Sequence, residues 1–332
     1  MPLPSNEKII HDSQEVISLL HKLFGEHPGI RPGTIQSSIR LLSELTVYHT
    51  AHGKGIMING TFTPSADAGK LSTASHLNNP STPISVRFSN STGLPNIPDN
   101  DPNADPRGMA IRFHLGPRRH TDIIGHSTPF FPVRTGAEFL EFFQAIASSP
   151  PGGPSPSPVE QFLGSHPSAL TFVQAPKPAP SSYAREAYFG LNAFKLIDAH
   201  GNATTIRYRM VPGLGVETLD SEGLKEKDVD YLHKEIETRL QEGPVTFRLM
   251  AEIAEAGDIT DDVTVHWPET RSLMELGSVK LESTVKDQVK EQKYIIFDPI
   301  PRVEGVEPSD DPVLEFRAAV YLISGRERRS AP

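Results

Sequence analysis

The chain has 332 residues and no cysteine. Disulfide bonds, zinc–thiolate sites, iron–sulfur clusters, covalent C-x-x-C-H haem attachment and cysteine nucleophiles are therefore all excluded. The absence is compatible with a reducing compartment, where structural disulfides are rare. Any chemistry that the protein performs must use other side chains.

Basic runs and long apolar runs are also missing. The formal net charge is −9, and an acidic balance disfavours contact with nucleic-acid phosphates or anionic membrane surfaces. No stretch is long and apolar enough to cross a bilayer, and residues 1–6 lack the basic start and apolar run of a secretory signal. We therefore expect a cytoplasmic protein with no nucleic-acid partner and no membrane span.

Chain breakers are abundant, with 31 prolines and 25 glycines, which predicts many turns and short elements. Strand character is found in eight segments: residues 55–63, 83–89, 107–114, 120–124, 188–198, 203–211, 245–254 and 276–283. In one of them Met109, Ile111 and Phe113 alternate with polar residues. We expect an α+β fold with an eight-stranded antiparallel β-barrel, which removes exposed strand edges. A barrel of that size can hold one ligand.

Apolar residues at helical spacing predict helices over residues 12–24, 35–47, 136–147 and 225–241. Before the last helix, Ser309 or Asp310 can act as the cap and Pro312 suits the first turn, while residues 313–323 are apolar-periodic. The breaker-rich loop at 148–158 is expected to wrap around the barrel, since neither flank alone supplies enough strands for a closed sheet. We predict one domain over 1–332, with a helical arm at 1–50, the barrel with its helices at 51–298 and the final helix within 299–332.

Two features could carry chemistry. Arg317 and Tyr321 are four residues apart, so they share one face of the last helix. An arginine beside a phenol favours the phenolate, a hard ligand for ferric iron. His52 lies among small residues before the first strand, where a neutral imidazole could take a proton from a peroxide and return it. Each feature alone also fits a plain surface contact or a turn histidine.

Five motifs follow one another along the chain: His52-Gly53-Lys54-Gly55, Arg87-Phe88-Ser89, Asp105-Pro106-Arg107-Gly108 with the strand behind it, the segment 122–131, and the final Arg317-x-x-x-Tyr321. In this order they resemble the catalase superfamily, from about residue 24 to residue 329. The resemblance is closest to the short catalase-related peroxidases, which lack the C-terminal helical and flavodoxin-like parts of full-length catalases. It implies the catalase-core fold and a non-covalent haem b.

The resemblance also implies roles for residues that bind that haem. Tyr321 is similar to the iron ligand, and Arg317 to the arginine that keeps the ligand oxygen anionic. Arg328, seven residues after Tyr321, resembles an arginine near a haem propionate, and Arg87 is likewise assigned to cofactor binding.

On the distal side, His52 resembles the catalytic histidine, and Ser89 the serine that bonds its other ring nitrogen and fixes its tautomer. Phe131 resembles an aromatic residue that limits access, and Phe139 the phenylalanine stacked on the porphyrin. Catalases have an asparagine after the glycine of the D-x-x-G segment, where this chain has His126. That asparagine helps hold a second peroxide in catalases. We therefore expect His126 to be a catalytic residue, and we expect the protein to have weak catalase activity and to favour peroxidase chemistry.

A second departure precedes His52. The family has an arginine three positions before the distal histidine, whereas Arg31 lies 21 positions before it and His49 occupies the expected slot. This predicts an insertion at about residues 32–49, which could be an ordered extra helix, a lineage-specific loop or a retained intron in the gene prediction. If His49 replaces the arginine, one propionate contact is weakened, because imidazole is not a bidentate fork.

The predicted function is a haem peroxidase that reduces hydrogen peroxide or organic hydroperoxides with a small organic donor. Two alternatives are a fatty-acid hydroperoxide isomerase or lyase, like the allene oxide synthases that share this fold, and a non-enzymatic haem-binding barrel. A porphyrin-free metal site of His49, His52 and His126 lacks the spacing of a facial triad. Since catalase relatives often assemble as dimers or tetramers, the resemblance also allows a homo-oligomer.

Overall fold

The fold is that of a computed structural model, which describes residues 5–24 and 52–330. The predicted helix at 35–47, the predicted insertion at 32–49 and the two side chains discussed with it, Arg31 and His49, lie outside the described residues.

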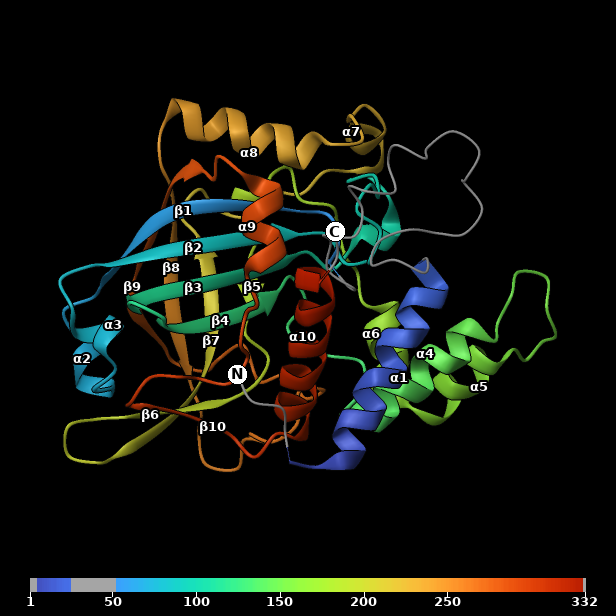
Figure 1. Cartoon of the computed structure of the whole chain (residues 1–332), viewed down its shortest axis with the longest axis horizontal. Helices are drawn as coiled ribbons and strands as arrows, with labels where there is room; N and C mark the ends of the chain where they lie inside the picture. The colour runs from blue at the N-terminus through green and yellow to red at the C-terminus, as the bar shows by residue number, and fades with distance from the viewer. Residues whose placement is uncertain (1–4, 25–51, 331–332) are drawn as a thin grey trace.

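A closed antiparallel barrel forms the larger part of the molecule (Figure 1). Its eight strands follow one another around the barrel in the order β7, β5, β4, β3, β2, β1, β9 and β8, and β7 pairs with β8 to close the ring. Their bounds are β1 (Gly55–Pro64), β2 (Thr82–Ser89), β3 (Gly108–Gly116), β4 (Arg119–His126), β5 (Tyr188–Phe189), β7 (Ala203–Pro212), β8 (Val245–Ile253) and β9 (Leu273–Thr284). Outside the ring, β6 (Phe194–Ile197) pairs with β7, and β10 (Val306–Pro308) pairs with β6. The predicted eight-stranded barrel is confirmed.

The barrel interior is filled by side chains. Alternate residues of each strand point inward, so that Phe88, Ile111 and Phe247 are fully buried members of one apolar core. The expectation that the barrel itself holds a ligand is therefore wrong. The residues between the inward-pointing ones point to the outside of the barrel. On β2–β4 this outer face is covered by helices and carries the candidate site.

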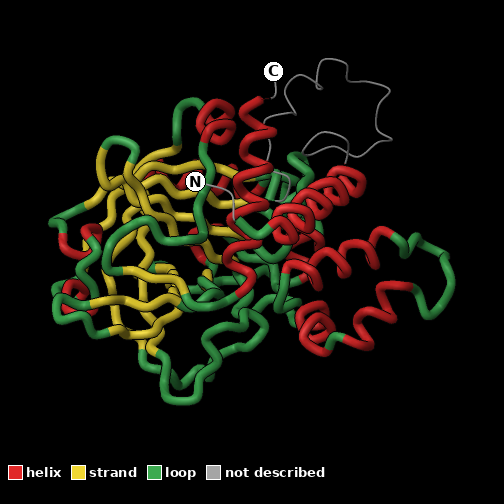
Figure 2. The backbone as a smooth tube through the Cα atoms, turned by 60° about the horizontal axis from the view of Figure 1, so that its bottom comes forward, coloured by secondary structure: helices red, strands yellow, loops and turns green. Residues whose placement is uncertain are grey.

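Helices cover the barrel and form a separate group beside it. Their bounds are α1 (Glu7–Phe24), α2 (Ala68–Leu71), α3 (Ser75–Asn78), α4 (Gly136–Ala147), α5 (Pro158–Ser165), α6 (Pro167–Gln174), α7 (Ser221–Lys225), α8 (Tyr231–Glu242), α9 (Gln288–Tyr294) and α10 (Pro312–Ser330). Figure 1 shows α10 between the barrel and the group formed by α1, α4, α5 and α6, and Figure 2 shows that group projecting from one side of the strands. Val16 and Leu20 of α1 pack on α4 and α10, which joins the group to the barrel through α10.

Two predicted elements are interrupted. The strand expected at 188–198 is split into β5 and β6, because Asn192 turns its side chain to Asp311 and Arg317 of the last helix. The helix expected at 225–241 is interrupted after Lys225, the last residue of α7, and resumes only at Tyr231 as α8, because the backbone carbonyl of Val229 accepts hydrogen bonds from Lys54 Nζ and from the Asp99 amide.

The last helix begins as predicted at Pro312, but its cap is Asp311 rather than Ser309 or Asp310. The Asp311 carboxylate accepts a hydrogen bond of 2.9 Å from the amide of Val313. Among the helices within residues 5–24 and 52–330, none combines the length and apolar character needed to cross a membrane.

Candidate functional site

A cavity lies between the outer face of β2–β4 and the helices α1, α4 and α10. It contains about 1450 Å³ of space not filled by atoms, its open mouth included. Every site residue expected from the sequence lines it: His52, Arg87, Ser89, His126, Phe131, Phe139, Arg317, Tyr321 and Arg328. The structure therefore brings together residues that are up to 276 positions apart in the chain.

One row of cross-strand neighbours forms the floor of the cavity on the barrel side. Gly55, Ser89, Gly108 and His126 lie opposite one another on β1, β2, β3 and β4. Directly paired residues point to the same side of a sheet. A Cβ atom on Gly108 would lie 2.6 Å from Ser89 Oγ and 3.1 Å from His52 Nδ1. The His52 ring thus occupies the space that the missing side chain of Gly108 leaves between Ser89 and His126.

The turn that carries His52 is held in an unusual conformation. His52 has φ 57°, a left-handed geometry that a non-glycine residue adopts only when its surroundings impose it. The amides of His52 and Gly53 donate to the carbonyls of Ser91 and Thr92 at 2.8 and 2.7 Å. Arg87 donates from one nitrogen to the carbonyls of His52 and Gly53, at 2.8 and 3.2 Å. Arg87 therefore holds this turn, a contact that the sequence did not reveal.

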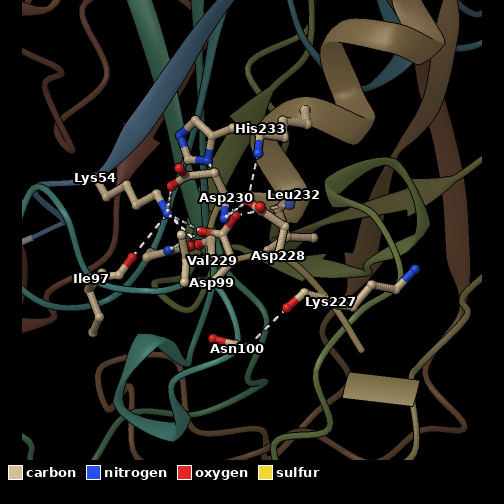
Figure 3. A network of polar contacts seen from close by, with 12 residues as sticks. Lys54, Ile97, Asp99, Asn100, Lys227, Asp228, Val229, Asp230, Leu232 and His233 are labelled. Carbon is tan, nitrogen blue, oxygen red and sulfur yellow. Dashed lines mark hydrogen bonds and ion pairs between the residues drawn. The ribbon is translucent and has the colours of Figure 1, made fainter. Parts of the chain in front are cut away.

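Lys54 ties the same turn to the start of α8 (Figure 3). Its ammonium group lies 2.8 Å from Asp99 and 2.6 Å from Asp230, and it also donates to the Ile97 carbonyl at 3.0 Å. Asp99 is fully buried, and Asn90 donates to it at 2.7 Å. Burial alone would raise the pKa of Asp99, but Lys54 and His233, the latter 3.6 Å away, lower it below its usual range. Lys54 thereby ties the His52 turn to the buried carboxylate of Asp99 and to the half-exposed Asp230 before α8.

Both imidazoles on this wall are neutral near pH 7. Burial, reinforced by the positive charge of Arg87, lowers the pKa of His52 to about 4. Burial, with His52 and Arg317 nearby, lowers the pKa of His126 to about 3. Ser89 Oγ lies 3.1 Å from His52 Nδ1, and Thr128 Oγ1 lies 2.8 Å from His126 Nδ1. Each ring therefore has one nitrogen engaged by a hydroxyl.

The α10 wall presents Tyr321 and Arg317. Arg317 donates to Tyr321 Oη at 3.2 Å and, with its other terminal nitrogen, to the side-chain oxygen Oδ1 of Asn192. Asn192 in turn donates to the Asp311 carboxylate at 3.0 Å. Asn192 and Asp311 were not identified from the sequence, although a lone asparagine in the apolar Leu191–Ala193 stretch was a usable signal.

Two buried arginines on the cavity wall have no carboxylate partner within the described ranges. Arg328 is 2% exposed, donates to the Ile295 carbonyl at 2.6 Å, and its Nε has no hydrogen-bond partner among the described residues. Arg87 is 4% exposed and its remaining bond is to Gln292 at 2.9 Å. Burial lowers the pKa of Arg328 to about 9 and that of Arg87 to about 10, and both remain charged at pH 7. Two buried positive charges of this kind make this part of the cavity suited to an anionic group.

Aromatic side chains form the remaining apolar boundary. Phe131 and Phe139 stack at 5.5 Å with an interplanar angle of 24°, and Phe139 meets Phe143 edge-on at 4.8 Å. The cavity is wide and apolar, with arginines at one part, a phenol on one wall and imidazoles on another. These features fit a flat, amphipathic ligand that carries carboxylates, such as haem. Within residues 5–24 and 52–330, no group of three histidine or acidic side chains is arranged to bind a metal ion directly.

The barrel and the cavity beside it are those of a catalase core. The sequence agrees, because residues 43–331 match the catalase family, and the chain therefore belongs to that family. It is 36% identical over 280 residues to a catalase-related peroxidase of Mycolicibacterium paratuberculosis, covering 83% of this chain and 88% of that one. It is 30% identical over 305 residues to a catalase-related peroxidase of Synechococcus elongatus, covering 90% and 89%.

The fold agrees with solved structures of longer relatives. A fungal catalase superposes with a TM-score of 0.75 at 21% identity, over 86% of this chain and 60% of the catalase. The chain spans about 60% of the length of that catalase, and haem is the cofactor that the family implies.

Proposed function

We propose that the protein is a haem b peroxidase that reduces hydrogen peroxide or organic hydroperoxides with a small organic electron donor and has little catalase activity. One observation carries the proposal: Tyr321 with Arg317, and His52 with Ser89, line the same cavity from two different elements. Each pair joins a chemically useful group to the residue that orients it. We further propose that residues 1–332 act as one catalase-core domain.

In this proposal Tyr321 Oη binds the iron, and Arg317 places a positive charge and an N–H donor beside that oxygen. Arg328 and Arg87 would hold the propionate groups, which would supply the anionic partners that both lack within the described residues. Phe139 would pack against the porphyrin, and Phe131, which stacks on Phe139, would narrow the approach from the mouth. Haem, when bound, supplies the redox-active iron that reduces the peroxide and is restored by the organic donor.

The distal residues move and hold the proton. His52 is neutral at pH 7, so one ring nitrogen has a free lone pair. If Nδ1 donates to Ser89 Oγ, Nε2 is the nitrogen that takes the proton of a bound peroxide and later returns it to the departing oxygen. Gly108 leaves room for the ring, and Arg87 keeps the His52 turn in its left-handed conformation.

Reconstitution tests this function. The purified protein is titrated with ferric haem while the optical spectrum is recorded, and peroxide-dependent oxidation of a phenolic donor is compared with oxygen release. We expect stoichiometric haem binding, donor oxidation and little oxygen. In Tyr321→Phe the spectrum of tyrosine-ligated ferric haem should be lost, whereas Tyr294→Phe, a change at a half-exposed tyrosine of α9, should leave it intact. A wild-type spectrum in Tyr321→Phe would refute the assignment.

A further inference from the structure

We propose that Thr128 fixes His126 as a hydrogen-bond donor through Nε2–H, and that this donor holds the departing oxygen of a bound hydroperoxide. The inference rests on the proposed function for its substrate class. It assigns Thr128 a positioning role and gives His126 one direction of hydrogen bonding.

The tautomer follows from the contacts of Nδ1. The Thr128 amide lies 3.3 Å from His126 Nδ1 and the Thr128 hydroxyl lies 2.8 Å from it. A backbone N–H can only donate, and no other acceptor for this amide is found among the described residues. Nδ1 must therefore present its lone pair. In a neutral imidazole the hydrogen is then on Nε2.

The Nε2–H group has no acceptor of its own. His126 Nε2 is shielded from water and has no hydrogen-bond partner within residues 5–24 and 52–330. Buried donors in proteins are almost always paired. Other atoms of His126 line the cavity, so a small rotation of the ring brings this N–H to an oxygen of a ligand there.

His126 is also placed beside the proposed proton acceptor. His52 lies over Gly108, and Gly108 is the direct cross-strand neighbour of His126. Neighbouring strands are about 4.8 Å apart, so the two rings border the same small space. His52 with a free lone pair and His126 with a fixed N–H form complementary partners for the two oxygens of a hydroperoxide, R–O–O–H. The hydroxyl proton faces His52, and the oxygen that will leave as R–OH faces His126.

Thr128 is suited to fix this arrangement. It is 4% exposed, and its hydroxyl is also within 3.3 Å of the Phe130 carbonyl, which limits its rotation. An asparagine side chain at position 126 could turn either its oxygen or its nitrogen toward a ligand. A histidine held at Nδ1 has only the donor to offer.

The tautomer is measured on the haem-free protein by ¹⁵N NMR of histidine-labelled material, with His126→Asn identifying the resonances by their disappearance. We expect the Nε2-protonated form in the wild type. In Thr128→Val we expect the Nδ1 resonance to shift as one of its donors is lost, and Thr128→Ser should restore the wild-type position. An Nδ1-protonated His126 would overturn the inference whatever the enzyme does.

The donor is measured separately with cyanide, whose outer nitrogen accepts hydrogen bonds at the place of the second peroxide oxygen, by optical titration of the ferric haem protein. His126→Leu should bind cyanide about tenfold more weakly, the value of one lost hydrogen bond. Unchanged cyanide affinity would contradict the donor role. If haem does not bind to the wild type at all, the proposed function fails, while the NMR result still decides the tautomer.

Discussion

The Gly108→Ala variant tests the row of residues that forms the floor of the site. The added Cβ would lie 2.6 Å from Ser89 Oγ, closer than real Cβ contacts, and 3.1 Å from His52 Nδ1. Ser89 is 4% exposed and the His52 turn is fixed by four backbone contacts, so neither group can move away freely. We therefore expect His52 to be displaced from its position beside Ser89.

Overpacking of this kind costs about 1–3 kcal/mol, and the loss of unfolded-state freedom on replacing glycine returns about 0.4–1 kcal/mol. The free energy of unfolding should therefore fall by about 1–2 kcal/mol, the balance of these two effects. A displacement of His52 by several tenths of an ångström should lower peroxide turnover by about tenfold or more. Haem binding should persist, because Tyr321 lies on α10 and not on this floor.

Urea unfolding, haem titration and the peroxidase assay measure the three quantities on one preparation. Gly164→Ala is the control, since a Cβ at Gly164 of α5 meets no atom within 4 Å. It should keep turnover and, since no contact opposes the gain from replacing glycine, raise the free energy of unfolding by about 0.4–1 kcal/mol. Normal turnover in Gly108→Ala would refute the claim that His52 stands over Gly108.

Two further predictions concern charge. Because the pKa of His52 is lowered to about 4 from 6.5, the unfolded chain binds more protons than the folded chain between these pH values, and the resulting stability of about 3 kcal/mol is present above pH 6.5 and lost as the pH falls through 4. The acid limb of the pH profile of peroxidase activity should therefore lie near pH 4. An acid limb near pH 6.5 would contradict the burial of His52. Lys54→Met leaves the buried Asp99 carboxylate without its lysine and should lower the free energy of unfolding by about 3–5 kcal/mol, whereas Asp230→Asn, a change at a half-exposed residue, should lower it by about 1 kcal/mol or less. The double variant Lys54→Met/Asp99→Asn should recover part of the loss, because the unpaired carboxylate is then removed. Equal effects of Lys54→Met and Asp230→Asn in urea unfolding would contradict a stabilising buried ion pair between Lys54 and Asp99.

Local patterns in the sequence identified the strands because each barrel strand has one face in an apolar interior, which imposes a period of two. The start of α10 was likewise predictable, since Pro312 and a nearby acidic residue act within a few positions. Its cap was misplaced because three polar residues precede the proline, and only the fold decides which of them reaches the amide.

Features set by distant residues were not predictable from local patterns. The split of the 188–198 strand depends on Asn192 meeting Asp311 and Arg317, more than 100 positions away. The position of the cavity on the outer face of the barrel depends on α10 packing there, and alternation alone does not say which face a helix will cover. The site residues were identified as a set through the family resemblance, while the role of Thr128 required the three-dimensional contacts.

A crystal structure of the haem-loaded protein tests the central claim most directly, because it locates the iron relative to both walls of the cavity. We predict that Tyr321 Oη is the axial ligand, that His52 and His126 lie on the opposite face of the porphyrin, and that the propionates meet Arg87 and Arg328. Iron bound by a histidine, or haem located away from this cavity, would contradict the account.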